Sequence, residues 1–388
     1  MKCNWRDCTL GDLITFQRGH DLSKKQMTDG KYPVIGSNGI IGYHDQYTTE
    51  APSITIGRSG NVGTPFIFYG RTWSHNTTLY VKNFKGNDPL FVFYFLKTMS
   101  LANYAGGSAV PTLNRNHIHA LPIRVPSSVE AQKKIGGFLR LFDKKIELNN
   151  AINKNLEQQA QALFKSWFIT NPNNVNWKRG TFAELIISTL NGDWGKESPS
   201  GNHTEKVYCV RGADIPDVKA GNKGKMPTRY ILPKNYISKK LSDGDIVIEI
   251  SGGSPTQSTG RCTAITQSLI DRYDSGMVCT NFCKAIKPID GYSMFIYYYW
   301  QYLYSHRVFF SYENGTTGIK NLDFSGFLES ESIIIPPVEQ VLKFNEYCKA
   351  VFDQVFANGK QTEQLAKIRD TLLPKLMSGE IDISALDL

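Results

Sequence analysis

The chain of 388 residues is predicted to adopt a mixed α/β (α+β) fold, in which two globular lobes are joined by two long helices that form an antiparallel coiled coil. Two observations predict this fold. Residues 127–168 and 336–377 both have the apolar periodicity of a long amphipathic helix. The segments that precede these helices begin alike, at 5–13 and 177–185. The two halves of the chain therefore form a pseudo-twofold tandem repeat.

The two long helical stretches share one pattern of seam residues, spaced alternately four and three positions apart as in a coiled coil. Ten seam positions of the first stretch recur in the second at a constant offset of 209 residues. The first set is Ile135, Leu139, Phe142, Ile146, Asn149, Asn153, Leu156, Ala160, Leu163 and Trp167. The second set is Phe344, Cys348, Val351, Val355, Asn358, Thr362, Leu365, Arg369, Leu372 and Leu376. Arg369 in the seam and Gly359 within the helix depart from an ideal coil.

A polar layer interrupts both seams at the same place and consists of Asn149, Asn153, Asn358 and Thr362. Such a layer costs stability unless its groups are paired, but it fixes the register of the helices. We therefore expect these four side chains to meet near the midpoint of the coil. The alternative is two separate amphipathic helices, each packed on its own lobe. A pseudo-twofold relation between the repeats favours the antiparallel direction.

The composition indicates a globular protein with room for two cores, at 41% hydrophobic and 20% charged residues. The net charge of +9 and the pI of about 9.0 favour a polyanionic partner. No run of 18 apolar residues occurs, and the first residues lack the apolar stretch of a signal peptide, so we expect a cytoplasmic protein without a membrane span. The seven cysteines show no CxxC spacing, which favours reduced, buried thiols.

The lobes begin alike, because Trp5, Thr9, Leu10, Asp12 and Leu13 recur at an offset of 172 as Trp177, Thr181, Phe182, Glu184 and Leu185. The helices recur at 209, so the second lobe carries about 37 extra residues within its middle (209 minus 172). We therefore expect two binding domains that share one architecture and differ in specificity. The predicted boundaries are 1–126 for the first lobe, 127–170 for the central helix, 171–335 for the second lobe and 336–380 for the last helix.

Each lobe contains strand-like runs and one apolar helix. In the first lobe they are strands at Tyr32–Ile35, Ser53–Ile56, Phe66–Phe68 and Leu79–Val81, a helix at Pro89–Met99 and an exit strand at Leu121–Val125. In the second lobe they are strands at Val207–Val210, Asp245–Ile250 and Cys262–Ile265, a helix at Ser293–Tyr304 and an exit strand at Ser332–Ile335. Pro126 and Pro336 are expected in the first turns of the long helices, and Gly379 at the end of the second.

Glycine- and serine-rich loops are the candidate binding elements. They follow a strand at 57–63 in the first lobe and at 251–261 in the second, and a further loop, Gly36–Gly39, lies in the first. Glycine lets backbone N–H groups approach phosphate closely. For an isolated loop the alternative is an ordinary hairpin, and for Gly36–Gly39 it is a type I′ turn. The recurrence in both repeats favours a binding role.

Polar, basic and aromatic residues in and around these loops are the candidate DNA contacts, since Arg reads guanine, Asn and Gln read adenine, and Lys neutralises phosphate. In the first lobe they are Arg18, His20, Ser37, Asn38, Arg58, Ser59, Asn61, Arg71, His75, Asn76, Thr112, Asn114 and Arg115. In the second they are Trp194, Lys196, Arg211, Lys223, Lys225, Arg229, Ser254, Thr256, Gln257, Arg261, Thr317 and Lys320. For any single residue the alternative is a solvated surface group.

Catalytic motifs are absent from the sequence. There is no GxxxxGK[ST] phosphate loop, no HExxH or other metal-ligand spacing, and no GxSxG nucleophile elbow. Asn171–Asn174 is not the Asn-Pro-Pro-aromatic motif of an amino-methyltransferase. The chain is therefore expected to bind rather than catalyse, with no catalytic residue and no metal. The alternative is a coiled-coil scaffold whose lobes bind proteins or glycans, which would show no salt-dependent affinity for duplex DNA.

Three stretches together carry a resemblance to a known family. The opening Trp-x-x-x-Thr-Leu-Gly-Asp-Leu (Trp5–Leu13), the segment YPVIGSNGIIGY (Tyr32–Tyr43) and LLPKLMSGEI (Leu372–Ile381) resemble the specificity subunit of type I restriction–modification systems. The resemblance extends over essentially the whole chain, as a variable lobe and a conserved helix, each occurring twice.

The resemblance implies that each lobe is a target recognition domain for one half of a bipartite, asymmetric site in double-stranded DNA. It implies two partner methyltransferase subunits that methylate adenine N6 and bind S-adenosylmethionine, and a motor-nuclease subunit for restriction. This chain would carry no cofactor. About 40 helical residues would span about 60 Å, so the coil could act as a ruler between half-sites about 34 Å apart. The base-reading residues lie in the most variable parts of such lobes, so the resemblance assigns no base contact.

Overall fold

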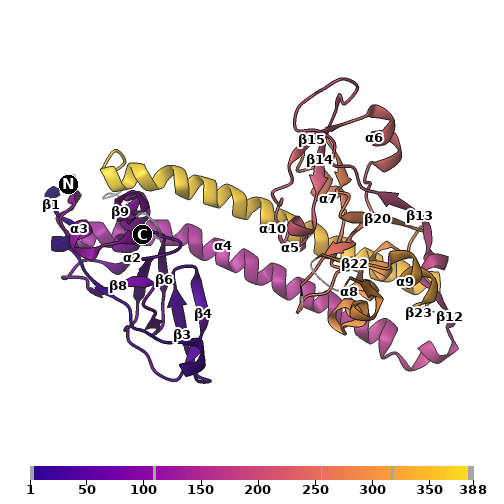
Figure 1. Ribbon diagram of the computed structural model, residues 1–388, viewed down its shortest axis with the longest axis horizontal. Helices are drawn as coiled ribbons and strands as arrows, with labels where there is room; N and C mark the ends of the chain where they lie inside the picture. Colours follow the sequence, from indigo (N-terminus) through magenta and orange to yellow (C-terminus); the bar gives the residue numbers. More distant parts are fainter. Residues whose placement is uncertain (1–3, 108–110, 255, 316–318, 383–388) are drawn as a thin grey trace. The chain divides into compact units, whose positions relative to one another are not determined.

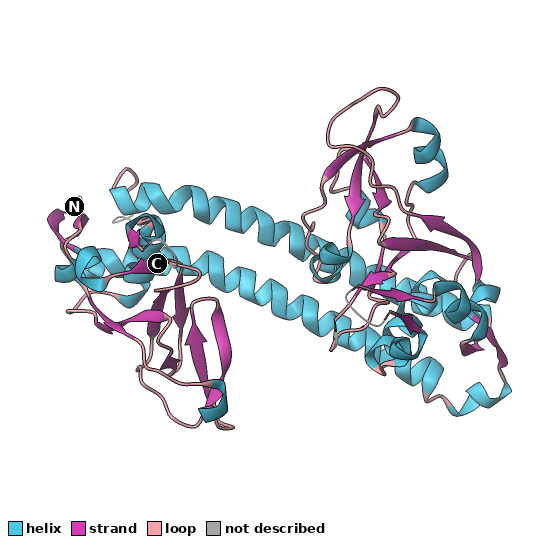
Figure 2. Ribbon diagram, in the orientation of Figure 1, coloured by secondary structure: helices cyan, strands magenta, loops and turns pink. Residues whose placement is uncertain are grey.

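A computed structural model describes residues 4–107, 111–254, 256–315 and 319–382. It divides into two compact units (Figure 1). Unit one comprises Met1–Lys145 and Leu365–Leu388, and unit two comprises Ile146–Gln364. Each unit thus contains one lobe together with a segment of each long helix, and in each lobe the strands form the body of the domain (Figure 2).

Two larger sheets form the body of lobe one, beside the two-stranded pairs β1-β11 and β10-β9. A four-stranded antiparallel sheet has the order β2-β8-β5-β6, and a three-stranded sheet has the order β4-β3-β7, with β3 and β7 parallel. The strands are β1 (Trp5–Thr9), β2 (Thr15–Arg18), β3 (Tyr32–Gly36), β4 (Gly39–His44), β5 (Ser53–Gly57), β6 (Pro65–Phe68), β7 (Trp73–Ser74), β8 (Thr78–Asn83), β9 (Ala105–Gly106), β10 (Thr112–Leu113) and β11 (Pro122–Pro126). The helices are α1 (Leu10–Leu13), α2 (Pro89–Thr98) and α3 (Arg115–His119).

Lobe two repeats this plan with the sheets β13-β20-β16-β18 and β15-β14-β19, the latter again with one parallel pair, β14 and β19. The strands are β12 (Lys178–Thr181), β13 (Ile186–Asn191), β14 (Glu205–Val210), β15 (Thr228–Ile231), β16 (Ile246–Glu249), β17 (Ser251–Gly252), β18 (Cys262–Ala264), β19 (Gly276–Cys279), β20 (Cys283–Pro288), β21 (Glu313–Asn314), β22 (Lys320–Leu322) and β23 (Ser332–Ile335). The helices are α5 (Ile215–Lys219), α6 (Pro233–Lys239), α7 (Gln267–Ile270), α8 (Ser293–Ser305) and α9 (Phe324–Ser330).

The predicted elements of both lobes are present, with ends within two residues of the expected positions. The extra residues of lobe two lie in connections between strands. A two-residue turn, 37–38, joins β3 to β4, whereas the equivalent connection from β14 to β15 runs over 211–227 and contains α5. Further helices, α6 and α7, fill two other connections of lobe two. The sheets are therefore conserved between the repeats, and the connections differ.

The two long helices are α4 (Val129–Phe164), which continues as a π-helical turn over Lys165–Ile169, and α10 (Val338–Ser378). The helix α10 passes through Pro374 and ends where predicted, because Gly379 has a φ of +78°. The expectation that Pro126 and Pro336 occupy the first helical turns was wrong. Pro126 pairs with Trp5 as the last residue of β11, and Pro336 precedes α10 by two residues. Ser128 precedes α4 instead, and its Oγ accepts a hydrogen bond from the Ala131 N–H at 3.1 Å.

Within unit two, α4 and α10 run antiparallel and the four polar-layer residues meet. The Asn358 amide donates to Asn153 Oδ1 at 2.8 Å, and the Asn149 amide donates to the Asn358 carbonyl and to Thr362 Oγ1, both at 3.4 Å. Asn149, Asn153 and Asn358 are all buried. The Asn153 amide also donates to the carbonyl oxygens of Val355 and Ala220, both at 3.0 Å. The layer therefore joins the two helices to a loop of lobe two.

Gly359 explains why this loop can reach the coil. A Cβ atom built on Gly359 would lie 1.8 Å from the carbonyl oxygen of Gly221. The same oxygen accepts a hydrogen bond from Arg272 Nη1 at 2.7 Å, and Arg272 Nη2 binds Glu363 at 2.7 Å. The glycine that departs from the ideal helical pattern is thus the site where the α5–β15 connection docks on α10.

Arg369 has an equally specific setting in unit one. Its Nη1 pairs with Asp143 of α4, and its Nη2 lies 2.8 Å from Asp370. Asp143 also accepts a hydrogen bond from the Tyr94 hydroxyl of α2. Burial, together with this hydrogen bond, raises the pKa of Tyr94, so the phenol keeps its proton and remains a donor. Arg369, which does not fit the predicted apolar seam, therefore links α4 and α10 to lobe one.

The core of unit one is assembled from distant parts of the chain. Residues of α1, β5, β8 and α2 form one buried cluster with Leu139 of α4 and with Leu373, Leu376 and Met377 near the end of α10. The lobe is also closed by pairing of its first and last strands, β1 with β11, as β12 pairs with β23 in lobe two. Within the described ranges, no helix is long and apolar enough to cross a membrane.

Candidate nucleic-acid interface

The two glycine-containing loops of lobe one lie beside each other. In the loop 57–63, the Gly63 N–H donates to the Gly57 carbonyl at 2.8 Å, and a Cβ atom on Gly57 would lie 1.7 Å from the Asn61 carbonyl oxygen. A Cβ atom on Gly60 would lie 3.1 Å from Ser37 Oγ in the β3–β4 turn. Glycine at these positions thus allows the close packing of the two loops. Asn38 and Asn61 are exposed on them.

Beside these loops is an open groove of about 490 Å³. It is lined by Arg18, Arg58, Leu79, Gly106, Thr112, Leu113, Asn114, Arg115 and His117. Five of the candidate residues are therefore brought together, and three of them are arginines. Ser59 adjoins them through a β-bridge to Thr112. No carboxylate lines the groove among the described residues, so an anionic partner is favoured.

Backbone hydrogen bonds fix the two elements that carry the groove. The Arg58 N–H donates to the Thr77 carbonyl at 2.8 Å, and the Arg58 carbonyl accepts from the Leu113 N–H at 2.9 Å. The next residue, Asn114, caps α3 by accepting from the Asn116 N–H at 2.9 Å. Arg58 and Arg115 are thus held on adjoining, well-ordered backbone.

Four further lobe-one candidates have partners inside the lobe. Arg71 binds Glu50 at 2.8 Å and lies 4.5 Å from the ring centroid of Tyr47. The Asn76 amide donates to Asp21. The His75 ring bonds to Thr77 Oγ1 at 3.0 Å and to the Leu22 carbonyl at 3.2 Å, and the His20 ring lies against Trp73 and Tyr80. These side chains stabilise the segments around the loops.

His119, at the end of α3, makes the stability of lobe one sensitive to pH. Its Nε2 accepts a hydrogen bond from the Phe16 N–H at 2.9 Å, and its ring stacks on the Phe16 ring. Burial first, and then the charges of Arg115 and Lys85, lower the pKa of His119 below its usual value.

We expect the wild-type chain to lose about 1 kcal/mol of stability, the worth of one hydrogen bond, as the pH falls below about 6.5. Stability falls on acidification because His119 binds a proton more readily in the unfolded state. The hydrogen bond of His119 therefore contributes to stability above the pKa of the unfolded state, and this contribution is lost below it. Urea unfolding at pH 7.5 and 5.5 measures this loss. The control His119→Gln keeps an acceptor near the position of Nε2 but cannot titrate, and equal losses in both proteins would contradict the prediction.

In lobe two, the basic residue of the candidate loop and that of the paired strand β22 bind carboxylates. Arg261 Nε and Nη2 bind Glu249 at 2.7 and 2.6 Å, and Lys320 binds Glu313 at 2.7 Å. The hydrogen bond to Glu249 raises the pKa of Arg261 further and keeps it charged. In the loop between Glu249 and Arg261, the N–H groups of Thr256 and Gln257 donate to Ser254 Oγ. The loop is thus ordered by its own contacts.

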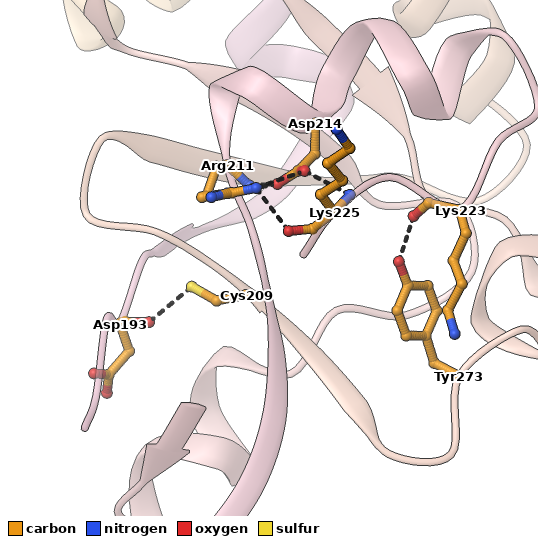
Figure 3. A network of polar contacts seen from close by, with 7 residues as sticks. All are labelled: Asp193, Cys209, Arg211, Asp214, Lys223, Lys225 and Tyr273. Atoms are coloured by element: carbon orange, nitrogen blue, oxygen red, sulfur yellow. Dashed lines mark hydrogen bonds and ion pairs between the residues drawn. The ribbon is translucent and has the colours of Figure 1, made fainter. Parts of the chain in front are cut away.

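The connection 211–227 is ordered in the same way (Figure 3). Arg211 binds both oxygens of Asp214 at 2.9 and 3.0 Å and the Lys225 carbonyl at 2.7 Å. The Lys223 ammonium lies 4.5 Å from the ring centroid of Tyr273, whose hydroxyl donates to the Lys223 carbonyl. The Lys225 side chain is exposed, and its backbone N–H donates to Asp214. Of these three basic candidates, Arg211 is the one whose charge is already balanced by a carboxylate.

Trp194, Arg229 and Lys196 form a third group in lobe two. Arg229 is 8% exposed, lies 3.9 Å from the ring centroid of Trp194 and binds Glu197 at 3.0 Å. The Lys196 ammonium lies 3.5 Å from Ser200 Oγ. Thr317 is outside the described residues. The structure therefore distributes the lobe-two candidates over several sites, whereas it gathers five of the lobe-one candidates in one groove.

Strand register identifies the lobe-two positions that correspond to the groove. In lobe one, Leu79 of β8 pairs with Arg18 of β2 and with Ile56 of β5. In lobe two, Lys284 of β20 pairs in the same way with Asn191 of β13 and with Ile248 of β16. The Leu322 N–H donates to the Ile250 carbonyl at 2.8 Å, as Leu113 does to Arg58. The residues equivalent to Arg18, Arg58, Leu79 and Arg115 are therefore Asn191, Ile250, Lys284 and Phe324. The Lys284 ammonium lies 5.1 Å from the Phe324 ring centroid, so these side chains are also neighbours.

These lobe-two residues were not among the sequence candidates. Arg115 and Phe324 have the same offset of 209 as the exits of the two lobes, so this pair was detectable. The other pairs have different offsets because insertions separate the strands, and only the strand register identifies them.

The cysteines are not poised for chemistry. Burial raises the pKa of Cys209 and Cys262 to about 12 and that of Cys283 to about 11, so these thiols stay protonated. Within the part of the chain that the structure describes, the cysteines are free of disulfides, and no group of three His, Cys, Asp or Glu side chains could hold a metal ion. Cys3 lies outside the described residues.

Comparison with known proteins identifies relatives of one kind. The family described as "Type I restriction modification DNA specificity domain" matches residues 2–158. The type I restriction enzyme MjaIX specificity subunit of Methanocaldococcus jannaschii is 28% identical over 318 residues, which cover 76% of this chain and 70% of that protein. The HindI specificity subunit of Haemophilus influenzae is 24% identical over 399 residues, which cover 87% and 82%.

A solved structure shares the fold. The crystal structure of the type I restriction–modification S subunit from M. genitalium superimposes with a TM-score of 0.60 at 18% identity and covers 96% of both chains. The mixed α/β fold, with two β-rich lobes and the contacting helices α4 and α10, is thus the fold predicted from the sequence. The chain is thus similar, over most of its length, to specificity subunits of type I restriction–modification systems, and residues 2–158 match the DNA specificity domain of these systems.

Proposed function

We propose that each lobe binds one half of a bipartite, asymmetric site in double-stranded DNA, so that the two lobes together define the target. The main support is the comparison of the lobes. They have the same sheets and the same junction between the candidate loop and the exit strand, yet the equivalent positions carry Arg58 in one and Ile250 in the other. A shared scaffold with different exposed chemistry suits two readers of different sequences.

The groove of lobe one is the proposed interface there, with Arg18, Arg58 and Arg115 toward the DNA. The loop carrying Asn38 and Asn61 would lie beside it. In lobe two, the exposed Lys225 and the partly exposed Lys223 and Lys284 would contribute to binding. The net charge of +9 supports the attraction to the phosphate backbone.

The chemistry would belong to the partners. We propose two methyltransferase subunits, which bind S-adenosylmethionine and methylate adenine N6 in each half-site, and a motor-nuclease subunit for restriction. The adenine would be flipped out of the stack by the methyltransferase. This chain would bind no cofactor and would act in the cytoplasm, where the genomic target is located.

A methylation map tests the proposal. The chain is co-expressed with the methyltransferase subunit of the same system, and N6-methyladenine is mapped across the host genome by long-read sequencing. We expect one split motif with two defined halves and a fixed gap. Replacement of residues 1–126 by the equivalent lobe of another specificity subunit should change one half and leave the other intact. An intact complex that produces no new methylation would refute the proposal and favour a scaffold that binds proteins or glycans.

A further inference from the structure

The groove of lobe one contains arginines whose hydrogen-bonding capacity is unused. The side chains of Arg58 and Arg115 make no hydrogen bond or ion pair within the described residues. Arg18 has one weak contact, at 3.4 Å to Asp21, in which both side chains are more than half exposed. By contrast, Arg71, Arg211 and Arg261 bind carboxylates at 2.9 Å or less. The groove therefore presents free guanidinium groups rather than groups used for folding.

The free guanidinium groups are nevertheless anchored. The backbone N–H and carbonyl of Arg58 are both hydrogen-bonded, and its carbonyl partner, Leu113, lies two residues before Arg115. Thr112 and Asn114 flank them with further polar groups. A fixed backbone reduces the conformational entropy that is lost when a long side chain is held against a partner. This arrangement suits a planar target that a guanidinium can contact with two hydrogen bonds.

We propose that Arg58 and Arg115 are specificity-determining residues that read guanine through its O6 and N7 acceptors. The inference rests on the proposed function of the groove as a DNA interface. Arginine paired with these two acceptors is the commonest specific contact in the major groove, because the fork of the guanidinium matches their spacing. Phosphate contacts position a protein on DNA without reading its sequence, and exposed lysines can make them equally well.

The equivalent positions of lobe two extend the inference. Ile250 and Phe324 stand where lobe one has Arg58 and Arg115, and they cannot donate hydrogen bonds through their side chains. Phe324 is 5% exposed and packs in the core of lobe two, whereas Ile250 is partly exposed and suits contact with the methyl group of thymine. At a third pair of positions the chemistry is reversed, since Lys284 replaces Leu79. The two lobes would thus read different half-sites, because at equivalent positions a basic residue in one lobe corresponds to an apolar residue in the other.

The test uses the complex of this chain with its methyltransferase subunit and compares wild type, Arg58→Ala, Arg115→Ala and Arg58→Gln by methylation mapping. The half-site of lobe one is first identified by exchange of residues 1–126. We expect that half-site to contain a guanine and each alanine variant to relax discrimination at one guanine position roughly 10- to 100-fold. Arg58→Gln should shift the preference at its position toward adenine, since Gln pairs with adenine N6 and N7. The half-site of lobe two should be unchanged.

The matched control is Arg124→Ala. Arg124 is also an exposed arginine of lobe one, but it lies on β11 and outside the groove. It should leave the motif unchanged. Because the side chains of Arg58 and Arg115 make no hydrogen bond or ion pair among the described residues, their variants should unfold at the wild-type temperature, which is checked before mapping.

Two results would overturn the inference while leaving the proposed function intact. One is a lobe-one half-site without any G·C pair. The other is a uniform loss of affinity on all sequences, with a salt slope reduced by about one unit per variant, which indicates phosphate contacts. If the wild-type complex yields no split motif at all, the proposed function fails first, and the outcome is distinguishable from the other two.

Discussion

Replacing Gly359 with alanine should destabilise unit two by about 3 kcal/mol or more, although alanine is the better helix former by about 1 kcal/mol. The new Cβ atom would lie 1.8 Å from the oxygen and 2.6 Å from the carbon of the Gly221 carbonyl. Both atoms belong to the backbone, so the loop must move away from α10. Asn153 and Arg272 would then lose their bonds to Ala220 and Gly221, leaving polar groups unpaired at a buried site.

Gly137 provides the control for this prediction. It also lies inside a long helix, α4, but a Cβ atom there meets nothing within 4 Å. Gly137→Ala should therefore stabilise the chain by about 0.5–1 kcal/mol. Urea unfolding of the full chain measures both variants. A Gly359→Ala protein at least as stable as wild type would show that the loop does not depend on the close approach to α10.

Replacing Arg369 with leucine should destabilise unit one by about 3 kcal/mol, although leucine restores an apolar seam residue. The change leaves the Asp143 carboxylate, which is 16% exposed, without its main cation. Removing one partner of a fully buried pair costs about 3–5 kcal/mol, because the remaining charge is uncompensated, and the lower end applies to this partly buried pair. Lys97, whose ammonium lies 5.6 Å from the Tyr94 ring centroid, is close enough to reduce the loss.

The apolar triple variant Tyr94→Phe, Asp143→Leu and Arg369→Leu distinguishes pairing from packing. It removes the hydroxyl, the carboxylate and the guanidinium of this network together and leaves Asp370 and Lys97, which are both exposed to solvent. We expect its stability to lie within about 1 kcal/mol of wild type, or above it. Thermal and urea unfolding of the single and triple variants measure the difference. A triple variant as unstable as Arg369→Leu would attribute the effect to the shape of Arg369 rather than to its charge.

The sequence predicted the elements of this fold better than their connections. Apolar periodicity located α4 and α10 and every expected strand, because burial of one face imposes a period on the chain. It could not predict that Gly359 and Arg369 are docking points. Their partners, Gly221 and Asp143, lie far away in sequence, and a local pattern contains no information about contacts made by a distant loop. The prolines Pro126 and Pro336 were misplaced for a related reason, since strand pairing extends through Pro126.

The candidate interface was predicted in part. The repeat predicted binding loops after β5 and β16, and the structure brings Arg18, Arg58 and Arg115 together around one groove. Residue type alone could not separate these arginines from Arg211 and Arg261, which fold against carboxylates. That distinction depends on which side chains meet in three dimensions. Which of the candidates contact DNA stays a prediction.

The discontinuous core of unit one has a consequence for synthesis. Leu373, Leu376 and Met377 belong to the same buried cluster as Leu10 and Phe91, so lobe one cannot complete its interior when its own residues leave the ribosome. At about 5–20 residues per second, on the order of 10–50 s pass before the closing segment of α10 is translated. During that interval the nascent lobe exposes an apolar surface, and the second lobe can fold first. The amino-terminal domain of this chain is thus the last to mature.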